Sequence, residues 1–280
     1  MKIGVSGFAW ATNFDEKYFA VLPEVTRHGL AGVEVSIFDP AWVKTREIRQ
    51  AMEANGLQCS VCAILPPGVN PISPEAAVRK RSLGHLLQCI ETTAELGAKL
   101  LAGPVYAPIG YLPGHRPTGD EWNWAVETFQ ILGAALDAND VTLGVEPVNR
   151  SETFFLRTAA EAKRLCEAVA HQRVGITLDT FHANIEEKNI PDAVRLLGRH
   201  LKHVHASEND RGVPGSGHVD FTGIVAALRE VGYDRYLMIE GFGYSAEEKN
   251  APGTLWAELG VTPEEVAFGG GSYLRGLLAG

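Results

Sequence analysis

The chain has 280 residues and a mass of 30.2 kDa, which is long for one ordinary domain and close to the roughly 250 residues of an α/β barrel. Apolar residues make up 45% of it and charged residues 21%, a composition typical of a globular protein with a sizeable core. The net charge of −9 argues against nucleic-acid and anionic-membrane partners, because both require a basic surface.

Strand-like and helix-like segments alternate along the whole chain. In chain order, the predicted strands are KIGVSGF (2–8), GVEVS (32–36), LQCSVCAIL (57–65), KLLAG (99–103), VTLGVE (141–146), VGITLD (174–179), LKHVHA (201–206) and YLMIEGF (236–242). Between them, apolar residues recur three and four positions apart, which is the period of an amphipathic helix. Several of these stretches stop at a glycine, the usual helix end, namely at Gly29, Gly56, Gly97 and Gly232.

Strict alternation of eight strands with helices predicts parallel pairing through right-handed crossovers. At this length the pattern predicts one domain over residues 1–280, an α/β fold of the closed (β/α)₈ TIM barrel type. A doubly wound open sheet is the alternative, but SGFAWATN after the first strand lacks the Gly-rich turn of a dinucleotide site. Three long connections after strands four, seven and eight predict functional loops at residues 103–122, 206–220 and 241–256.

Cys59 and Cys62 form a CxxC pattern, which in another setting would indicate redox chemistry or zinc. Here the pair lies inside a predicted strand, where side chains three positions apart point to opposite faces. We therefore interpret both as buried apolar cysteines.

Four consecutive predicted strands carry a possible metal ligand near their C-terminal ends: Glu146, Asp179, His205 and Glu240. Neighbouring strands lie about 4.8 Å apart, so these ends can converge at the mouth of a barrel. Any one acid alone is better explained as a helix N-cap or a loop contact. Three carboxylates together repel one another unless a cation lies among them, and a set without thiolate suits Mn²⁺, Co²⁺ or Mg²⁺.

Other polar residues follow the same strands. Glu152 follows strand five, His182 follows strand six, and Arg211 lies in the loop after strand seven. His203 shares a strand face with His205, which predicts either a satisfied interior histidine, the interpretation we favour, or a group that supports a metal ligand.

In these segments the chain resembles the ketose 3-epimerases, the D-tagatose/D-allulose 3-epimerase group of the xylose isomerase-like TIM barrel superfamily. The resemblance extends over essentially the whole chain, and its most specific segments are GVEPVNRSE (144–152), LDTFHANIEE (178–187), HVHASENDRGVPGSG (203–217) and IEGF (239–242). It implies that Glu146, Asp179, His205 and Glu240 are the metal ligands and that Glu146 and Glu240 also form the catalytic acid/base pair. It further implies that Glu152, His182 and Arg211 hold O1 and O2 of the ketose, and that Phe242 lines the substrate pocket.

The implied activity is metal-dependent epimerisation at C3 of free ketoses such as D-tagatose, D-fructose/D-allulose or L-ribulose. One glutamate removes the proton next to the C2 carbonyl, and the other returns a proton to the opposite face of a cis-enediolate. We expect Mn²⁺, with Co²⁺ or Mg²⁺ as alternatives. An aldose–ketose or hydroxypyruvate-type isomerase and an inosose dehydratase remain alternatives on the same scaffold. An abasic-site endonuclease is disfavoured, because it needs several metals and a basic groove.

Two positions depart from the family pattern: Gly241 stands where proline is expected, and Asp210 where asparagine is common. Four aromatic residues near the loops either shape the pocket or pack the loops, namely Trp10, Phe14, Tyr106 and Tyr111. We expect a small ketose as partner, no nucleic acid or membrane, and a homodimer or homotetramer. A cytoplasmic location is expected as well, because the N-terminus enters a strand pattern without a leader and no apolar run approaches the roughly 20 residues of a membrane span.

Overall fold

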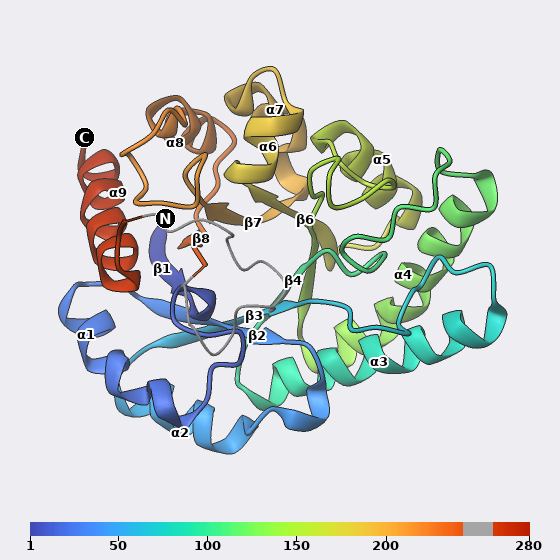
Figure 1. Ribbon diagram of the computed structural model, residues 1–280, viewed down its shortest axis with the longest axis horizontal. Coiled ribbons are helices and arrows are strands. Elements are labelled where there is room, and N and C mark those ends of the chain that lie inside the picture. The colour runs from blue at the N-terminus through green and yellow to red at the C-terminus, as the bar shows by residue number, and fades with distance from the viewer. Residues whose placement is uncertain (243–259) are drawn as a thin grey trace.

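The computed structural model describes residues 1–242 and 260–280. Its strands are all parallel and close into one barrel in sequence order, with helices around the outside (Figure 1). They are β1 (Lys2–Ser6), β2 (Gly32–Ile37), β3 (Gln58–Ala63), β4 (Leu100–Gly103), β5 (Thr142–Val145), β6 (Val174–Asp179), β7 (Leu201–Ala206) and β8 (Tyr236–Ile239). Pairing of β1 with β8, from Lys2 beside Tyr236 to Val5 beside Ile239, closes the barrel. The prediction of a (β/α)₈ barrel is confirmed, and the open sheet is wrong.

The surrounding helices are α1 (Leu22–Arg27), α2 (Thr45–Ala54), α3 (Ala76–Glu95), α4 (Gly119–Asn139), α5 (Ala159–Val169), α6 (Thr180–Glu186), α7 (Ile190–Leu197), α8 (Phe221–Glu230) and α9 (Gly270–Ala279). Short helical turns also occur at η1 (Gly7–Ala9), η2 (Glu16–Val21), η3 (Pro40–Trp42), η4 (Gly198–His200) and η6 (Glu265–Gly269). Reciprocal side-chain caps start α4 at Thr118 and Glu121 and start α5 at Thr158 and Glu161. The glycines predicted to end helices all have positive φ, between 66° and 74°.

Alternation along the strands places a polar layer inside the barrel. Glu34 of β2, Ser60 of β3, and His203 and His205 of β7 are all buried and contact one another through Glu34. Their neighbours in sequence, such as Val33 and Val204, belong instead to the hydrophobic core between strands and helices. The barrel interior therefore holds hydrogen-bonding groups directly below the strand ends that form its mouth.

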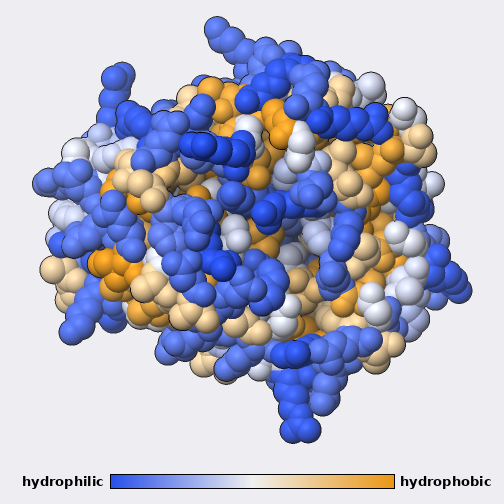
Figure 2. All heavy atoms as spheres, turned by 180° about the vertical axis from the view of Figure 1, so that it is seen from behind, coloured by the Kyte–Doolittle hydropathy of each residue, from blue (hydrophilic) through white to orange (hydrophobic). Residues whose placement is uncertain are grey.

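The loops after β4 and β7 are as long as the sequence predicts, since α4 begins only at Gly119 and α8 only at Phe221. Most of the predicted loop after β8 lies outside the described residues. On the face opposite to that of Figure 1, hydrophilic side chains predominate, with hydrophobic ones in patches among them (Figure 2). Within the described ranges, no helix combines the length and the apolar character needed to cross a membrane.

Candidate active site

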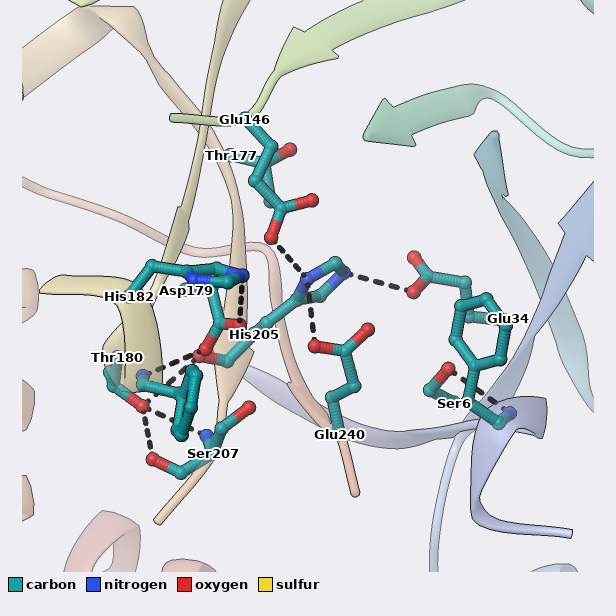
Figure 3. Close-up of polar contacts among 12 residues, drawn as sticks. Ser6, Glu34, Glu146, Thr177, Asp179, Thr180, His182, His205, Ser207 and Glu240 are labelled. Atoms are coloured by element: carbon teal, nitrogen blue, oxygen red, sulfur yellow. Dashed lines mark hydrogen bonds and ion pairs between the residues drawn. The ribbon is translucent and has the colours of Figure 1, made fainter. Parts of the chain in front are cut away.

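The four predicted ligands lie together at the mouth of the barrel, and each can offer one ligand atom within 4.8 Å of the others. All four are buried, and Figure 3 shows Glu146 and Glu240 on two sides of the His205 ring. His205 Nδ1 lies 3.2 Å from Glu146 Oε1 and 3.6 Å from Glu240 Oε2. The convergence follows from the fold, because parallel neighbouring strands end at the same rim.

Asp179 uses its two carboxylate oxygens differently. Oδ1 accepts a hydrogen bond of 2.9 Å from the backbone N–H of Phe181 and so caps α6. Oδ2 points into the site, where it lies 2.7 Å from Arg211 Nη1 and 3.6 Å from His182 Nε2. The two explanations for an acid at a strand end are therefore compatible, since one oxygen caps the helix and the other faces the cluster.

Burial and neighbouring charges shift the pKa values of these groups in different directions. Burial raises the pKa of Glu146 and raises that of Glu240 to about 8. Burial acts the same way on Asp179, but Arg211, the nearby histidines and the hydrogen bond from the Phe181 backbone N–H together outweigh it, and the pKa of Asp179 falls to about 2. For His205, burial alone would lower the pKa, but the carboxylates around the ring raise it well above its ordinary value.

The donor set fits a divalent cation. Three carboxylates and one imidazole come together here. Among the described residues, Arg211 is the one permanently charged cation within ion-pair distance of them. When the three carboxylates are ionised and His205 is neutral, as metal binding requires, one guanidinium leaves excess negative charge, which a 2+ ion would neutralise. Mostly hard oxygen donors with one imidazole suit Mn²⁺, Co²⁺ or Mg²⁺.

A cavity of about 300 Å³ opens directly above this cluster. All the residues predicted to hold substrate line it, namely Glu152, His182, Arg211 and Phe242. Its other walls are largely apolar and include Phe8, Ile64 and Ile109. Such a cavity suits a small, uncharged ligand with a few hydroxyl groups, because its lining combines a few polar side chains with apolar walls.

Asn149 is a residue of this site that the sequence interpretation missed. Its Nδ2 lies 2.8 Å from Glu152 Oε1 and 2.9 Å from His182 Nδ1, and its backbone N–H donates to the same Nδ1 at 3.2 Å. Nδ1 of His182 is therefore an acceptor, which places the ring proton on Nε2, toward Asp179. Burial lowers the pKa of His182 to about 3, so the ring is neutral. Asn149 lies in the quoted motif 144–152, but its spacing alone does not show which partners it has.

Glu34 is the second missed residue. It lies in the middle of β2 and contacts His205 from inside the barrel (Figure 3). An acid within a largely apolar strand was the available signal, because a buried carboxylate needs partners.

The four aromatic residues expected either to shape the pocket or to pack the loops mostly pack the loops and the core. Tyr106 is fully buried and donates its hydroxyl to the backbone carbonyl of Leu156 at 2.9 Å. Phe14 belongs to the hydrophobic core, and Tyr111 packs against Phe154. Trp10 donates to Glu264 Oε1 at 3.0 Å. The aromatic side chains that line the cavity are instead Phe8, Phe181 and Phe242.

Known proteins resemble this chain over nearly its full length. The family model described as xylose isomerase-like TIM barrel matches residues 22–260. A probable ketose 3-epimerase of Synechocystis sp. is 30% identical over 98% of this chain and 96% of its own length. An L-ribulose 3-epimerase of Mesorhizobium japonicum is 31% identical over 89% of this chain and 84% of its own. A solved structure of an L-ribulose 3-epimerase covers 100% of this chain and 95% of its own, with a TM-score of 0.91 and 30% identity.

Proposed function

Because the chain belongs to the xylose isomerase-like TIM barrel family and its near-full-length relatives are ketose 3-epimerases, we propose that it epimerises free ketoses at C3 with one divalent metal ion. The observation that carries the proposal is the pair of buried glutamates, Glu146 and Glu240, at 3.2 Å and 3.6 Å from the same nitrogen of His205. These two carboxylates directly follow the last residues of β5 and β8, so they approach the floor of the cavity from two directions.

Inverting C3 requires that a proton leave one face of the sugar and that another arrive on the opposite face. In this proposal Glu146 and Glu240 serve one face each, and the burial of both carboxylates away from bulk water supports it. Glu146, Asp179, His205 and Glu240 would hold the metal ion, for which Mn²⁺ is our choice. When bound, such an ion supplies Lewis-acid polarisation of the C2 carbonyl, which lowers the cost of removing the C3 proton.

The remaining polar residues orient the carbonyl end of the sugar. Arg211 and the Nε2–H of neutral His182 donate hydrogen bonds, whereas the Glu152 carboxylate accepts them from a hydroxyl group. Asn149 holds Glu152 and His182 in place. Phe242 and the apolar walls would pack against the carbon chain. Among the described residues that line the cavity, Arg211 is the one cation, and it is already paired with carboxylates, which supports an unphosphorylated substrate.

Product analysis tests this function. The Mn²⁺-loaded protein is incubated separately with D-fructose, D-tagatose and L-ribulose, and the products are separated by chromatography. We expect the C3 epimer from at least one ketose, loss of turnover with a chelator, and recovery with Mn²⁺. An aldose as the main product would instead assign an aldose–ketose isomerase, and turnover of inososes alone would assign a dehydratase.

Two variants link the product to the glutamates. Glu146→Gln and Glu240→Gln should each reduce turnover by about 10²-fold or more, because each removes an acid/base group. Glu121→Gln is the matched control, since this buried glutamate caps α4 away from the cavity and glutamine can serve in the same cap. Full turnover by either site variant would contradict the assigned roles.

A further inference from the structure

Glu34 is a carboxylate inside the barrel that the proposed reaction does not use. Its side chain is wholly buried, and both of its oxygens are in contact with polar groups. Oε1 lies 2.9 Å from His205 Nε2. Oε2 lies 2.9 Å from His203 Nε2 and accepts a hydrogen bond of 3.2 Å from Ser60 Oγ. A buried carboxylate is costly unless it is paired in this way, so its presence between two histidines calls for a role.

We propose that Glu34 is a positioning residue, which sets the orientation and the tautomer of His205 so that Nδ1 faces the metal position. The inference rests on the proposed function, because it assumes that His205 binds a metal ion through Nδ1. That nitrogen faces Glu146 and Glu240, whereas Nε2 faces Glu34, so the two ring nitrogens have separate partners (Figure 3).

The tautomer follows from the donor and acceptor count. A metal-binding Nδ1 must carry a lone pair, so the single proton of the neutral ring has to lie on Nε2. Glu34 Oε1 lies 2.9 Å from Nε2, close enough for its negative charge to favour a proton on that nitrogen. A carboxylate that accepts from the far nitrogen of a ligating histidine also increases the basicity of the ligating nitrogen. Glu34 would thus favour metal binding without touching the ion.

The remaining contacts hold Glu34 itself in place. His203 and Ser60 both contact Oε2, and the rings of His203 and His205 stand nearly perpendicular, with an angle of 85° and centroids 5.0 Å apart. His203 is therefore an interior histidine with a supporting role, because it lies against Oε2 of the carboxylate that contacts His205.

A competing role for Glu34 is direct metal ligation. Ligand atoms of Glu34, Cys62, His205 and Glu240 also come within 4.8 Å of one another. In that arrangement Glu34 would have to give up the close contacts that its two oxygens make with His205, His203 and Ser60. Cys62 would also have to lose a proton, although burial and the nearby carboxylates raise the pKa of its thiol well above the ordinary value. The ligand set of Glu146, Asp179, His205 and Glu240 needs neither of these two changes.

The test measures metal binding by the Glu34→Gln variant. Metal-free protein is titrated with Mn²⁺ in a calorimeter, which gives the Kd. A glutamine has one acceptor oxygen for two histidine N–H groups, and its amide N–H₂ faces the other ring. One histidine must then move its proton to Nδ1, which for His205 is the metal-binding nitrogen. We expect the Kd for Mn²⁺ to rise about 10- to 100-fold. Glu121→Gln, a buried glutamate of α4, should bind like wild type.

Two further variants separate the explanations. Ser60→Ala keeps the carboxylate and should change the Kd by less than about threefold, whereas Cys62→Ser should leave it near wild type. A large loss in Cys62→Ser would overturn the inference in favour of the second ligand set. A Glu34→Gln protein with lower thermal stability but wild-type affinity would show that Glu34 is only structural. If wild-type protein itself binds no divalent metal, the proposed function and this inference are both overturned, whereas unchanged affinity in Glu34→Gln alone overturns only this inference.

Should Glu34→Gln not fold, the wild-type protein still provides a test. With ¹⁵N-labelled histidine and Mg²⁺ bound, long-range ¹H–¹⁵N NMR reports the protonated nitrogen of the ring whose signals shift with metal. We expect a protonated, slowly exchanging Nε2 on that ring. A proton on Nδ1 would overturn the inference.

Discussion

Arg211 Nη1 lies 2.7 Å from Glu240 Oε2, and the same atom lies 2.7 Å from Asp179 Oδ2. A buried guanidinium therefore stands between two of the proposed metal ligands. Arg211 reaches this place with a backbone φ of 64°, an uncommon conformation for a residue with a side chain. Arg211 thus offsets the charge of both carboxylates, and we expect an exchange of this role, in which a metal ion bound among them supplies part of the neutralising charge.

Replacing Arg211 by glutamine tests this exchange. Without metal, the variant leaves two buried carboxylates without their cation, which should lower stability by roughly 3–5 kcal/mol. With Mn²⁺ bound the loss should be smaller, because the ion then supplies the positive charge. Thermal melting with chelator and with saturating Mn²⁺ measures both losses. Arg150→Gln is the control, since Arg150 forms an ion pair with Glu186 but is largely exposed. Equal losses in the two conditions would contradict the exchange.

Asn149→Ala should separate substrate positioning from metal binding. The variant removes the amide that contacts both Glu152 and His182 at 2.8 Å and 2.9 Å. A shift of even 1 Å in the side chains of Glu152 and His182 should lower kcat/KM by about 10- to 100-fold. Metal affinity should stay within about twofold, because Asn149 contacts none of the proposed ligands. Steady-state kinetics and calorimetric titration check the two quantities, and a parallel loss of metal affinity would refute the division of roles.

Gly241→Ala tests the departure from the family pattern. A Cβ at Gly241 would lie 2.9 Å from the carbonyl oxygen of Arg211 and 3.0 Å from Val266 Cγ1. The backbone of Arg211 thus packs against a position without a side chain. The Gly241→Ala variant should therefore lower the free energy of unfolding by about 1–3 kcal/mol. Gly276→Ala, where a Cβ meets nothing within 4 Å and the residue lies in α9, should be neutral or slightly stabilising. Chemical denaturation compares the two.

Chelator-treated protein should lose stability as the pH rises from about 6.5 to about 8, the range in which folded Glu240 still holds its proton and no buried neutral histidine offsets the effect. The raised pKa of Glu240, about 8, means that the folded protein keeps a proton that the unfolded chain has already released. Unfolding then releases protons, so higher pH favours unfolding, and the raised pKa values of Glu146 and His205 act in the same direction. Melting temperatures across this range provide the measurement. Glu240→Gln should flatten the decline, whereas a rising profile in wild type would contradict the assignment.

Much of the fold could be predicted because local patterns determine it. Strand and helix periods place all eight strands, and consecutive parallel strands bring Glu146, Asp179, His205 and Glu240 to one rim. Contacts across the barrel could not be predicted in the same way. Glu34 meets His205 only because β2 and β7 face each other once the barrel has closed. The expected oligomeric state stays a prediction.

Loop geometry sets the second limit. Asn149 acts through its side-chain direction, and Arg211 through a left-handed backbone, neither of which follows from residue spacing. The pair α6 and α7 after β6 also departs from strict alternation, because Asp179 caps a helix immediately at the strand end. Polar residues at strand ends thus identify the site from the sequence. The contacts that hold these residues in place can be seen only in the folded structure.

Deuterium exchange at C3 tests the central claim most directly. The protein is loaded with Mn²⁺, exchanged into Mg²⁺ to limit paramagnetic broadening, and incubated in D₂O with D-fructose, D-tagatose and L-ribulose in turn. We predict deuterium at C3 together with the C3 epimer, observed by NMR, and loss of both in Glu240→Gln. Deuterium at C1 with an aldose product, or no exchange on any of these ketoses, would contradict the account of Glu146 and Glu240 as the acid/base pair.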